Sequence, residues 1–214
     1  MRRSVNDYKL YVFDLDGTLY DQPKLRLIMA MRLMLYYMRH PLSIKELIVL
    51  QHFRKVKDNW TGSSSEEDIY EKVAKDKCIE PDKVAGIVKK WIYDNPLSAL
   101  IKARDDKLAM WIDKLRQSGK TVVVLSDYPT KDKLDALGIK VDGQYGPDDT
   151  RIDELKPSPA GLRVIMQDYG VSCEEVIMFG DREEKDGMCA DAAGVDRIIL
   201  KRRLSKRNYN EIGI

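Results

Sequence analysis

The sequence predicts an α/β fold, a Rossmann-like parallel sheet flanked by helices, with an inserted all-helical subdomain. Three observations lead to this prediction. Apolar runs alternate with helical patterns from residue 105 onward, another apolar run lies at residues 9–14, and only helical periodicity is found between them. The chain has 214 residues, 43% of them hydrophobic, which suffices for one core and a smaller subdomain.

The predicted strands are short apolar runs. KLYVFD near the N-terminus is the first, and TVVVLSD is continuous and β-branched, as expected of a strand covered on both faces. VIMFGD has the same character and DRIILK is a weaker example. The four runs occupy residues 9–14, 121–127, 176–181 and 196–201. Helices are predicted between them at 105–120 and 158–170, with Gly119 and Gly170 as stop signals. This repeat of strand, helix and strand predicts a parallel sheet.

Residues 21 to about 100 show helical periodicity and no convincing strand. Four helices are predicted, at 24–40, 43–60, 63–77 and 81–95. Ser63 with Glu66, and Ser64 with Glu67, each fit a capping box that opens the third helix. We interpret the apolar stretch MAMRLMLYYM in the first helix as packing. The prediction is therefore an α/β core from residues 1–20 and 101–214, interrupted by a helical unit at 21–100.

Composition narrows the class of protein. A formal net charge of +2 does not suggest a nucleic-acid binder. The three cysteines are far apart, which fits a reducing compartment better than a disulfide framework. The longest apolar run carries two arginines and is too short to cross a bilayer. We expect a cytoplasmic protein, monomeric or dimeric, that associates with neither membrane nor nucleic acid.

Acidic residues follow the predicted strands. Asp14, Asp127 and Asp181 end three of them, and Asp16 and Asp186 lie just beyond two of these ends. In an open parallel sheet the carboxyl ends of the strands form the ligand site, so these side chains should converge. Clustered carboxylates repel one another unless a cation neutralises them. Oxygen ligands without histidine or cysteine favour Mg²⁺, which also shares phosphate oxygens with a substrate.

Four motifs carry a resemblance to a known family. DLDGT at 14–18, LSD at 125–127, KPSP at 156–159 and GDREEKD at 180–186 occur in this order, the last continued by ADAAG at 190–194. Together they resemble the haloacid dehalogenase superfamily of phosphotransferases, and the match covers every signature region. In that superfamily a helical insert after the nucleophile motif is a mobile cap, which residues 21–100 resemble.

The first motif supplies the chemistry that can be argued from the residues. Asp14, at the strand end, is the candidate nucleophile, since a carboxylate that attacks phosphorus divides hydrolysis into two easier steps. Asp16, two residues on, can protonate the leaving alkoxide and later deprotonate the attacking water. Gly17 allows the sharp exit of the chain. The predicted metal ligands are Asp14, Asp16 and Asp181.

The other motifs supply the binding groups. Ser126 and nearby backbone N–H groups can hold phosphoryl oxygens, together with Gly17 and Lys156. Asp127 fits either this phosphate-binding strand end or an ordinary turn. Lys156 places positive charge against phosphate and nucleophile. Asp186 is expected to orient metal-bound water or Lys156 rather than ligate directly.

The expected function is that of a Mg²⁺-dependent phosphatase that hydrolyses a small phosphorylated metabolite through an aspartyl phosphate. A phosphomutase of the same superfamily and a catalytically silent binding module remain alternatives. The sequence does not identify the substrate. Residues 23–57 carry eight basic residues against Glu46, a local balance of +7. These either cover apolar surface with long side chains or attract an anionic substrate or partner. The basic cluster at 201–207 is predicted to be a solvated tail.

Overall fold

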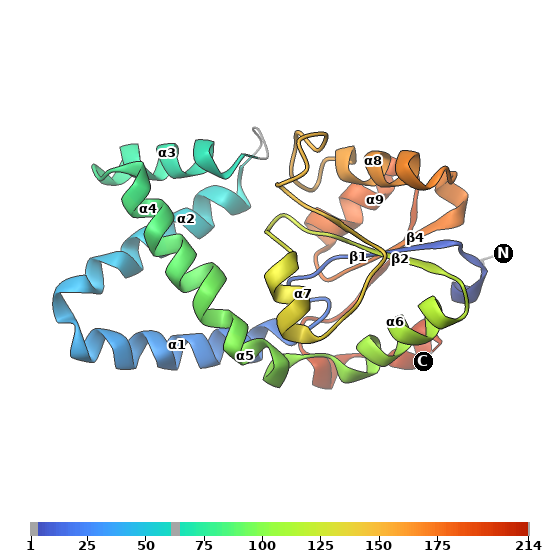
Figure 1. The fold of residues 1–214 in the computed structure, drawn as a ribbon, viewed down its shortest axis with the longest axis horizontal. Coiled ribbons are helices and arrows are strands. Elements are labelled where there is room, and N and C mark those ends of the chain that lie inside the picture. The colour runs from blue at the N-terminus through green and yellow to red at the C-terminus, as the bar shows by residue number, and fades with distance from the viewer. Residues whose placement is uncertain (1–3, 61–64, 214) are drawn as a thin grey trace.

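The computed structural model describes residues 4–60 and 65–213 of the chain. Its centre is a five-stranded sheet, entirely parallel, with the strand order β3-β2-β1-β4-β5 (Figure 1). The strands are β1 Leu10–Phe13, β2 Thr121–Leu125, β3 Gly143–Tyr145, β4 Val176–Gly180 and β5 Asp196–Ile199. The predicted α/β class is confirmed, and the three-residue β3 is an edge strand that the sequence patterns did not indicate.

Side chains alternate across the sheet into two apolar layers. On β1, Tyr11 and Phe13 enter one layer while Leu10 and Val12 enter the other, and all four are buried. Two helices, α6 Asp106–Gln117 and α7 Lys131–Leu137, cover the first face. Two others, α8 Ala160–Tyr169 and α9 Met188–Ala193, cover the second (Figure 1). Trp111 of α6 anchors the first layer, with its ring centroid 6.0 Å from that of Phe13. Burial on both faces explains why the central strands read as continuous apolar runs.

The sequence predicted two of these four core helices, α6 and α8, and did not indicate α7 or α9. Asp105 caps α6, since its side chain accepts the Leu108 N–H at 3.0 Å. Gly170 ends α8 in the left-handed conformation with a φ of +60°, and Gly119 follows α6 with a φ of +80°. Both predicted helix stops are confirmed.

Between β1 and α6 the described residues form helices and no strand. The helical insert consists of α1 Gln22–Arg39, α2 Lys45–Asp58, α3 Glu66–Lys77, α4 Pro81–Val88 and α5 Asn95–Ala103, with a π-helical stretch Lys89–Asp94 before α5. The two segments that connect the core to the insert are hydrogen-bonded to each other. Asp21 N–H donates to the Ala103 carbonyl at 2.8 Å, and Asp105 N–H donates to the Leu19 carbonyl at 3.0 Å. Ser63 and Ser64 of the predicted capping boxes lie outside the described residues.

The interpretation of MAMRLMLYYM as packing is only half right. Met29 and Tyr37 are buried, but Met31, Met34 and Met38 are more than half exposed. The reason is the position of α1 at the outer edge of the insert, where only one of its faces meets other helices (Figure 1). Helical periodicity shows which residues share a face, but the tertiary structure determines how many faces are covered.

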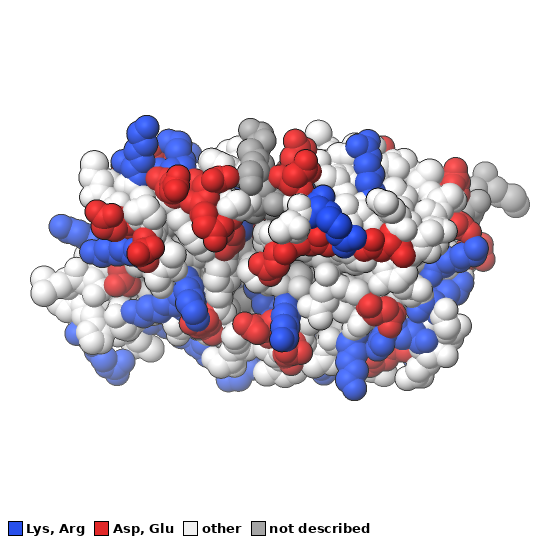
Figure 2. Space-filling view, turned by 45° about the horizontal axis from the view of Figure 1, so that its top comes forward, with Lys and Arg blue, Asp and Glu red and all other residues white. Residues whose placement is uncertain are grey.

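Charge on the surface is mixed. On the face shown in Figure 2, basic and acidic side chains are interspersed, in keeping with the net charge of +2. Among the described residues no helix is both long and apolar enough to cross a bilayer.

The predicted solvated tail at 201–207 is wrong for one of its arginines. Arg207 is buried and donates to the backbone carbonyls of Gly17 and Thr18 at 2.6 and 2.7 Å. The same guanidinium forms a buried ion pair with Asp105 at 2.6 Å. A basic cluster in the sequence is compatible with solvent, but a guanidinium group can equally donate to buried carbonyl and carboxylate oxygens, as that of Arg207 does.

Candidate active site

Asp14 directly follows β1 and stays in register with the sheet. Its N–H donates to Phe179 of β4 at 2.8 Å, and its side chain is buried. Thr18 Oγ1 donates to Asp14 Oδ2 at 3.0 Å. The chain leaves the strand through Gly17, whose φ of +105° favours glycine. A Cβ atom there would lie 2.5 Å from Oδ2 of Asp181, so only glycine fits beside that carboxylate.

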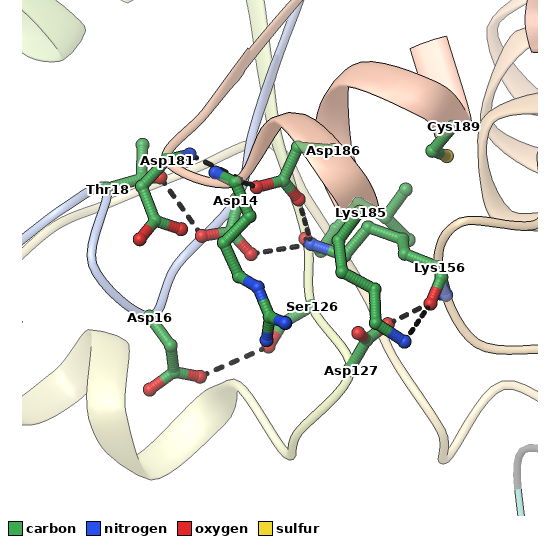
Figure 3. Close-up of polar contacts among 12 residues, drawn as sticks. Asp14, Asp16, Thr18, Ser126, Asp127, Lys156, Asp181, Lys185, Asp186 and Cys189 are labelled. Atoms are coloured by element: carbon green, nitrogen blue, oxygen red, sulfur yellow. Dashed lines mark hydrogen bonds and ion pairs between the residues drawn. The ribbon is translucent and has the colours of Figure 1, made fainter. Parts of the chain in front are cut away.

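Lys156, in the loop before α8, lies between two carboxylates. Its Nζ donates to Oδ1 of Asp14 at 2.6 Å and to Oδ1 of Asp186 at 2.7 Å (Figure 3). Burial lowers the pKa of Lys156, but the charges of Asp14, Asp186 and Asp127 outweigh it and hold the pKa well above its usual value. Lys156 is therefore a fixed positive charge beside the candidate nucleophile.

Asp186 is held by the turn that follows β4. It lies in the π-helical turn Glu183–Gly187, and its Oδ2 accepts the N–H groups of Asp181 and Arg182 at 3.1 and 3.0 Å. Burial raises the pKa of Asp186, but Lys156 and these N–H groups lower it further, so the net shift is downward. Asp186 thus positions Lys156 by a direct ion pair.

Three carboxylates form a group that could hold a metal ion. One oxygen each from Asp14, Asp181 and Asp186 lie within 4.8 Å of one another. Burial, followed by the neighbouring Asp186 and Asp181, raises the pKa of Asp14 despite the opposing charge of Lys156. A buried all-oxygen donor set with excess negative charge fits Mg²⁺. The grouping differs from the predicted ligand set, because Asp186 belongs to it and the Asp16 side chain does not.

Asp16 instead pairs with a lysine that the motifs did not indicate. Lys133, in the first turn of α7, donates from Nζ to both carboxylate oxygens at 2.6 and 2.8 Å, and the Tyr20 hydroxyl donates to Oδ1. Burial raises the pKa of Asp16, but Lys133 and Tyr20 reverse the shift and lower it. The only sequence signal for Lys133 is its place a few residues after the LSD strand end, in the first turn of the next helix.

Ser126 and Asp127 have different surroundings. The Ser126 hydroxyl accepts the Tyr128 N–H at 3.1 Å and lies 3.5 Å from Asp16 Oδ2 (Figure 3). Asp127 directs its carboxylate away from this hydroxyl and accepts the Lys156 N–H at 3.0 Å. Since a carboxylate repels phosphate, any phosphate contact by Asp127 would come from its backbone. Its side chain holds the Lys156 loop, which Lys185 Nζ supports by donating to the Lys156 carbonyl at 2.7 Å.

These residues open into a cavity of about 530 Å³ between the core and the helical insert. Its core side contains all of the acidic, serine and lysine positions discussed above, and also Arg202, which pairs with Asp181. Arg202 belongs to the stretch predicted as a solvated tail, so that prediction fails here too. The structure therefore brings Asp14, Asp16, Ser126, Lys156, Asp181 and Asp186 to one edge of the sheet, as the strand-end argument required.

A family model described as haloacid dehalogenase-like hydrolase matches residues 8–194. The chain belongs to this family. No curated protein matches the sequence. The haloacid dehalogenase-like fold is also found in solved structures of low identity. A 2-haloacid dehalogenase from Pseudomonas syringae pv. Tomato is 16% identical, with a TM-score of 0.64 over 90% of this chain and 86% of that one.

Two other solved structures of the same fold have different assignments. A predicted phosphoglycolate phosphatase from Haemophilus somnus is 20% identical, with a TM-score of 0.58 over 95% of this chain and 88% of that one. A Thermotoga maritima protein assigned as a β-phosphoglucomutase is 14% identical, with a TM-score of 0.55 over 90% and 84%. At these identities the likeness concerns the fold, and the reaction has to be argued from the residues of this haloacid dehalogenase-like hydrolase.

Proposed function

We propose that the protein is a Mg²⁺-dependent phosphatase that hydrolyses a small phosphomonoester through an aspartyl phosphate on Asp14. The observation that carries this proposal is the placement of Asp16. Asp16 lines the same cavity as the proposed nucleophile Asp14, is held by Lys133 and Tyr20, and lies within reach of the Ser126 hydroxyl. Hydrolysis of an alkyl phosphate needs a proton for the leaving oxygen, whereas release of a halide ion does not.

In the first step a carboxylate oxygen of Asp14 attacks phosphorus, and the bond from phosphorus to the ester oxygen breaks. Asp16 gives its proton to that oxygen, so the product leaves as an alcohol. Lys133 favours the ionised form of Asp16 in the free protein, and a dianionic phosphate beside Asp16 would raise its pKa again. Bound substrate thereby promotes the acid form that the first step needs.

In the second step Asp16, now ionised, takes a proton from water. The water oxygen attacks phosphorus, the bond from phosphorus to Asp14 breaks, and inorganic phosphate is formed. Lys156 and the Ser126 hydroxyl bind phosphoryl oxygens in both steps. Mg²⁺ bound by Asp14, Asp181 and Asp186 would supply positive charge to the same oxygens. The helical insert would act as a cap that excludes water and determines which leaving group fits.

The test is phosphate release from p-nitrophenyl phosphate and from an alkyl phosphate, with Mg²⁺ or with chelator. We expect turnover with Mg²⁺ only, and its loss in Asp14→Asn, because an amide cannot replace the nucleophile. Asp153→Asn is the matched control, since Asp153 is exposed and outside the cavity.

Four outcomes would contradict the proposal. More than about a hundredth of the activity in Asp14→Asn would remove its nucleophile role. Full activity in chelator would remove the metal. Halide release from 2-chloropropionate without any phosphatase activity would identify a dehalogenase instead. Transfer of the phosphoryl group between two positions of one sugar would favour the phosphomutase alternative.

A further inference from the structure

The helical insert supplies the cavity wall that faces the catalytic carboxylates. This wall is mostly apolar, with Leu25, Met29, Leu33, Leu50, Trp91 and Leu100 among its residues. Its charged groups on α1 and α2 are Arg26, Arg54 and Asp58. Of the eight basic residues at 23–57 that the sequence left without a role, only these two arginines line the cavity. Charge on an apolar wall calls for an explanation.

The other cations of the cavity have partners within the protein. Lys133 pairs with Asp16, and Lys156 with Asp14 and Asp186. Arg202 pairs with Asp181, Arg182 pairs with Asp58 and Glu184, and Lys185 donates to a backbone carbonyl. For Arg26 and Arg54, by contrast, the described part of the chain offers no ion pair or hydrogen bond. Among the described residues they are therefore the cations of the cavity that have no partner in the protein.

Nearby basic residues outside the cavity show that this is not a general property of the insert. Lys24 donates to the Lys102 carbonyl at 2.5 Å, and Arg32 donates to the Asn95 carbonyl at 2.5 Å. Lys57 is buried in an ion pair with Glu66. These side chains have structural partners, whereas the two cavity arginines have none among the described residues.

Arg26 and Arg54 also act on each other. Both residues are exposed, and the partial desolvation of the Arg54 guanidinium lowers its pKa, a shift to which the charge of Arg26 adds. Asp58, one turn further along α2, acts in the opposite direction, but its Oδ1 is occupied by Arg182 at 2.9 Å. Two neighbouring guanidinium groups without a counter-ion form a favourable site for an anion, which can accept hydrogen bonds from both.

We propose that Arg26 and Arg54 bind a second anionic group of the substrate, a carboxylate or a phosphate, at the end opposite the phosphoryl group that is cleaved. The carbon skeleton between the two anionic groups would lie against the apolar wall of the insert. This inference rests on the proposed function, since it takes the core end of the cavity as the phosphoryl site. It names the substrate class as phosphomonoesters that carry a second negative charge.

Binding of non-hydrolysable phosphonates tests the inference without requiring turnover. Calorimetric titration with Mg²⁺ present would compare ω-carboxyalkylphosphonates and alkane-bisphosphonates of two to six carbons with alkylphosphonates of equal length. We expect the second anionic group to tighten binding about 10- to 100-fold at one preferred chain length, the effect of a charge-assisted hydrogen-bonding site. The carboxylate and bisphosphonate series show which anionic group the arginines prefer.

Variants locate the effect. In Arg26→Gln/Arg54→Gln the affinity ratio of the carboxyalkylphosphonate to the alkylphosphonate should fall to about 1. Arg39→Gln is the matched control, because Arg39 is an exposed arginine of the same helix as Arg26 and does not line the cavity. It should keep the wild-type ratio.

Two results would overturn the inference. One is equal affinity for charged and uncharged phosphonates at every length in the wild-type protein, and the other is a preference that survives in the double variant. Neither depends on catalysis. If phosphonates bind with the expected preference but no phosphomonoester is hydrolysed, the proposed function fails and the second anion site stands.

Discussion

Replacement of Arg207 by methionine should destabilise the protein strongly. Arg207 lies near the C-terminus, and its buried guanidinium donates to four acceptors. These are the Asp105 carboxylate and the backbone carbonyls of Gly17, Thr18 and Lys201. Each of the two side chains in the ion pair is only 1% exposed. Methionine has similar length but no donor, so Asp105 would remain buried without its counter-charge.

The expected loss follows from the burial of the pair. Removal of one partner of a buried ion pair costs about 3–5 kcal/mol, because the other charge stays behind. Two further hydrogen bonds to Asp105, from Leu108 N–H at 3.0 Å and the Tyr209 hydroxyl at 2.8 Å, moderate this cost. For a chain of this size the loss corresponds to a fall in melting temperature of roughly 6–20 °C.

Chemical denaturation followed by circular dichroism measures the effect. Arg203→Met is the matched control, since Arg203 is an exposed arginine of the same segment, and its change should stay within about 0.5 kcal/mol. In a double-mutant cycle, Asp105→Asn should recover part of the loss in Arg207→Met by removing the unpaired charge. A loss below about 1 kcal/mol in Arg207→Met, or one equal to that of Arg203→Met, would refute the reasoning.

Four other predictions concern the site and the helix ends. Asp16→Asn should lower the rate with an alkyl phosphate by about 10²- to 10⁴-fold, and with p-nitrophenyl phosphate by less, since nitrophenolate leaves without a proton; equal losses would argue against leaving-group acid catalysis. Mg²⁺ at a hundred times its Kd should stabilise the protein by about 2.7 kcal/mol in denaturation curves, and no shift relative to chelator would count against the carboxylate site. Cys78→Gly should stabilise the protein by about 1 kcal/mol, because Cys78 ends α3 with a φ of +53°, a left-handed conformation that favours glycine. Gly170→Ala should destabilise it by a similar amount, because Gly170 has a φ of +60° and a Cβ there would meet no neighbouring atom. Denaturation curves with the opposite signs would show that backbone strain does not decide the stability of these variants. Burial raises the pKa of Cys189 to about 12, so iodoacetamide at pH 8 should modify the exposed Cys78 and spare Cys189 in a mass-spectrometric digest, and equal labelling would contradict that burial.

The sequence by itself determined the α/β class, the helical insert and the convergence of the acidic residues. These follow from local rules. A β-branched run such as residues 121–125 forms a strand buried on both faces, and parallel strands place their carboxyl ends at one edge. Asp14, Asp181 and Asp186 could therefore be brought together from their places after two apolar runs, although they lie far apart in the chain.

The environment of the charged side chains was decided only by the tertiary structure. Lys133 and Arg207 look like surface residues in the sequence, yet one pairs with Asp16 and the other with Asp105. The same holds for the two cavity arginines that have no partner among the described residues, and for the methionines exposed on α1. The physical reason is that a strand or helix arises from neighbours within a few residues. The surroundings of a charge depend on segments that fold in from more than a hundred positions away, and no local pattern records them.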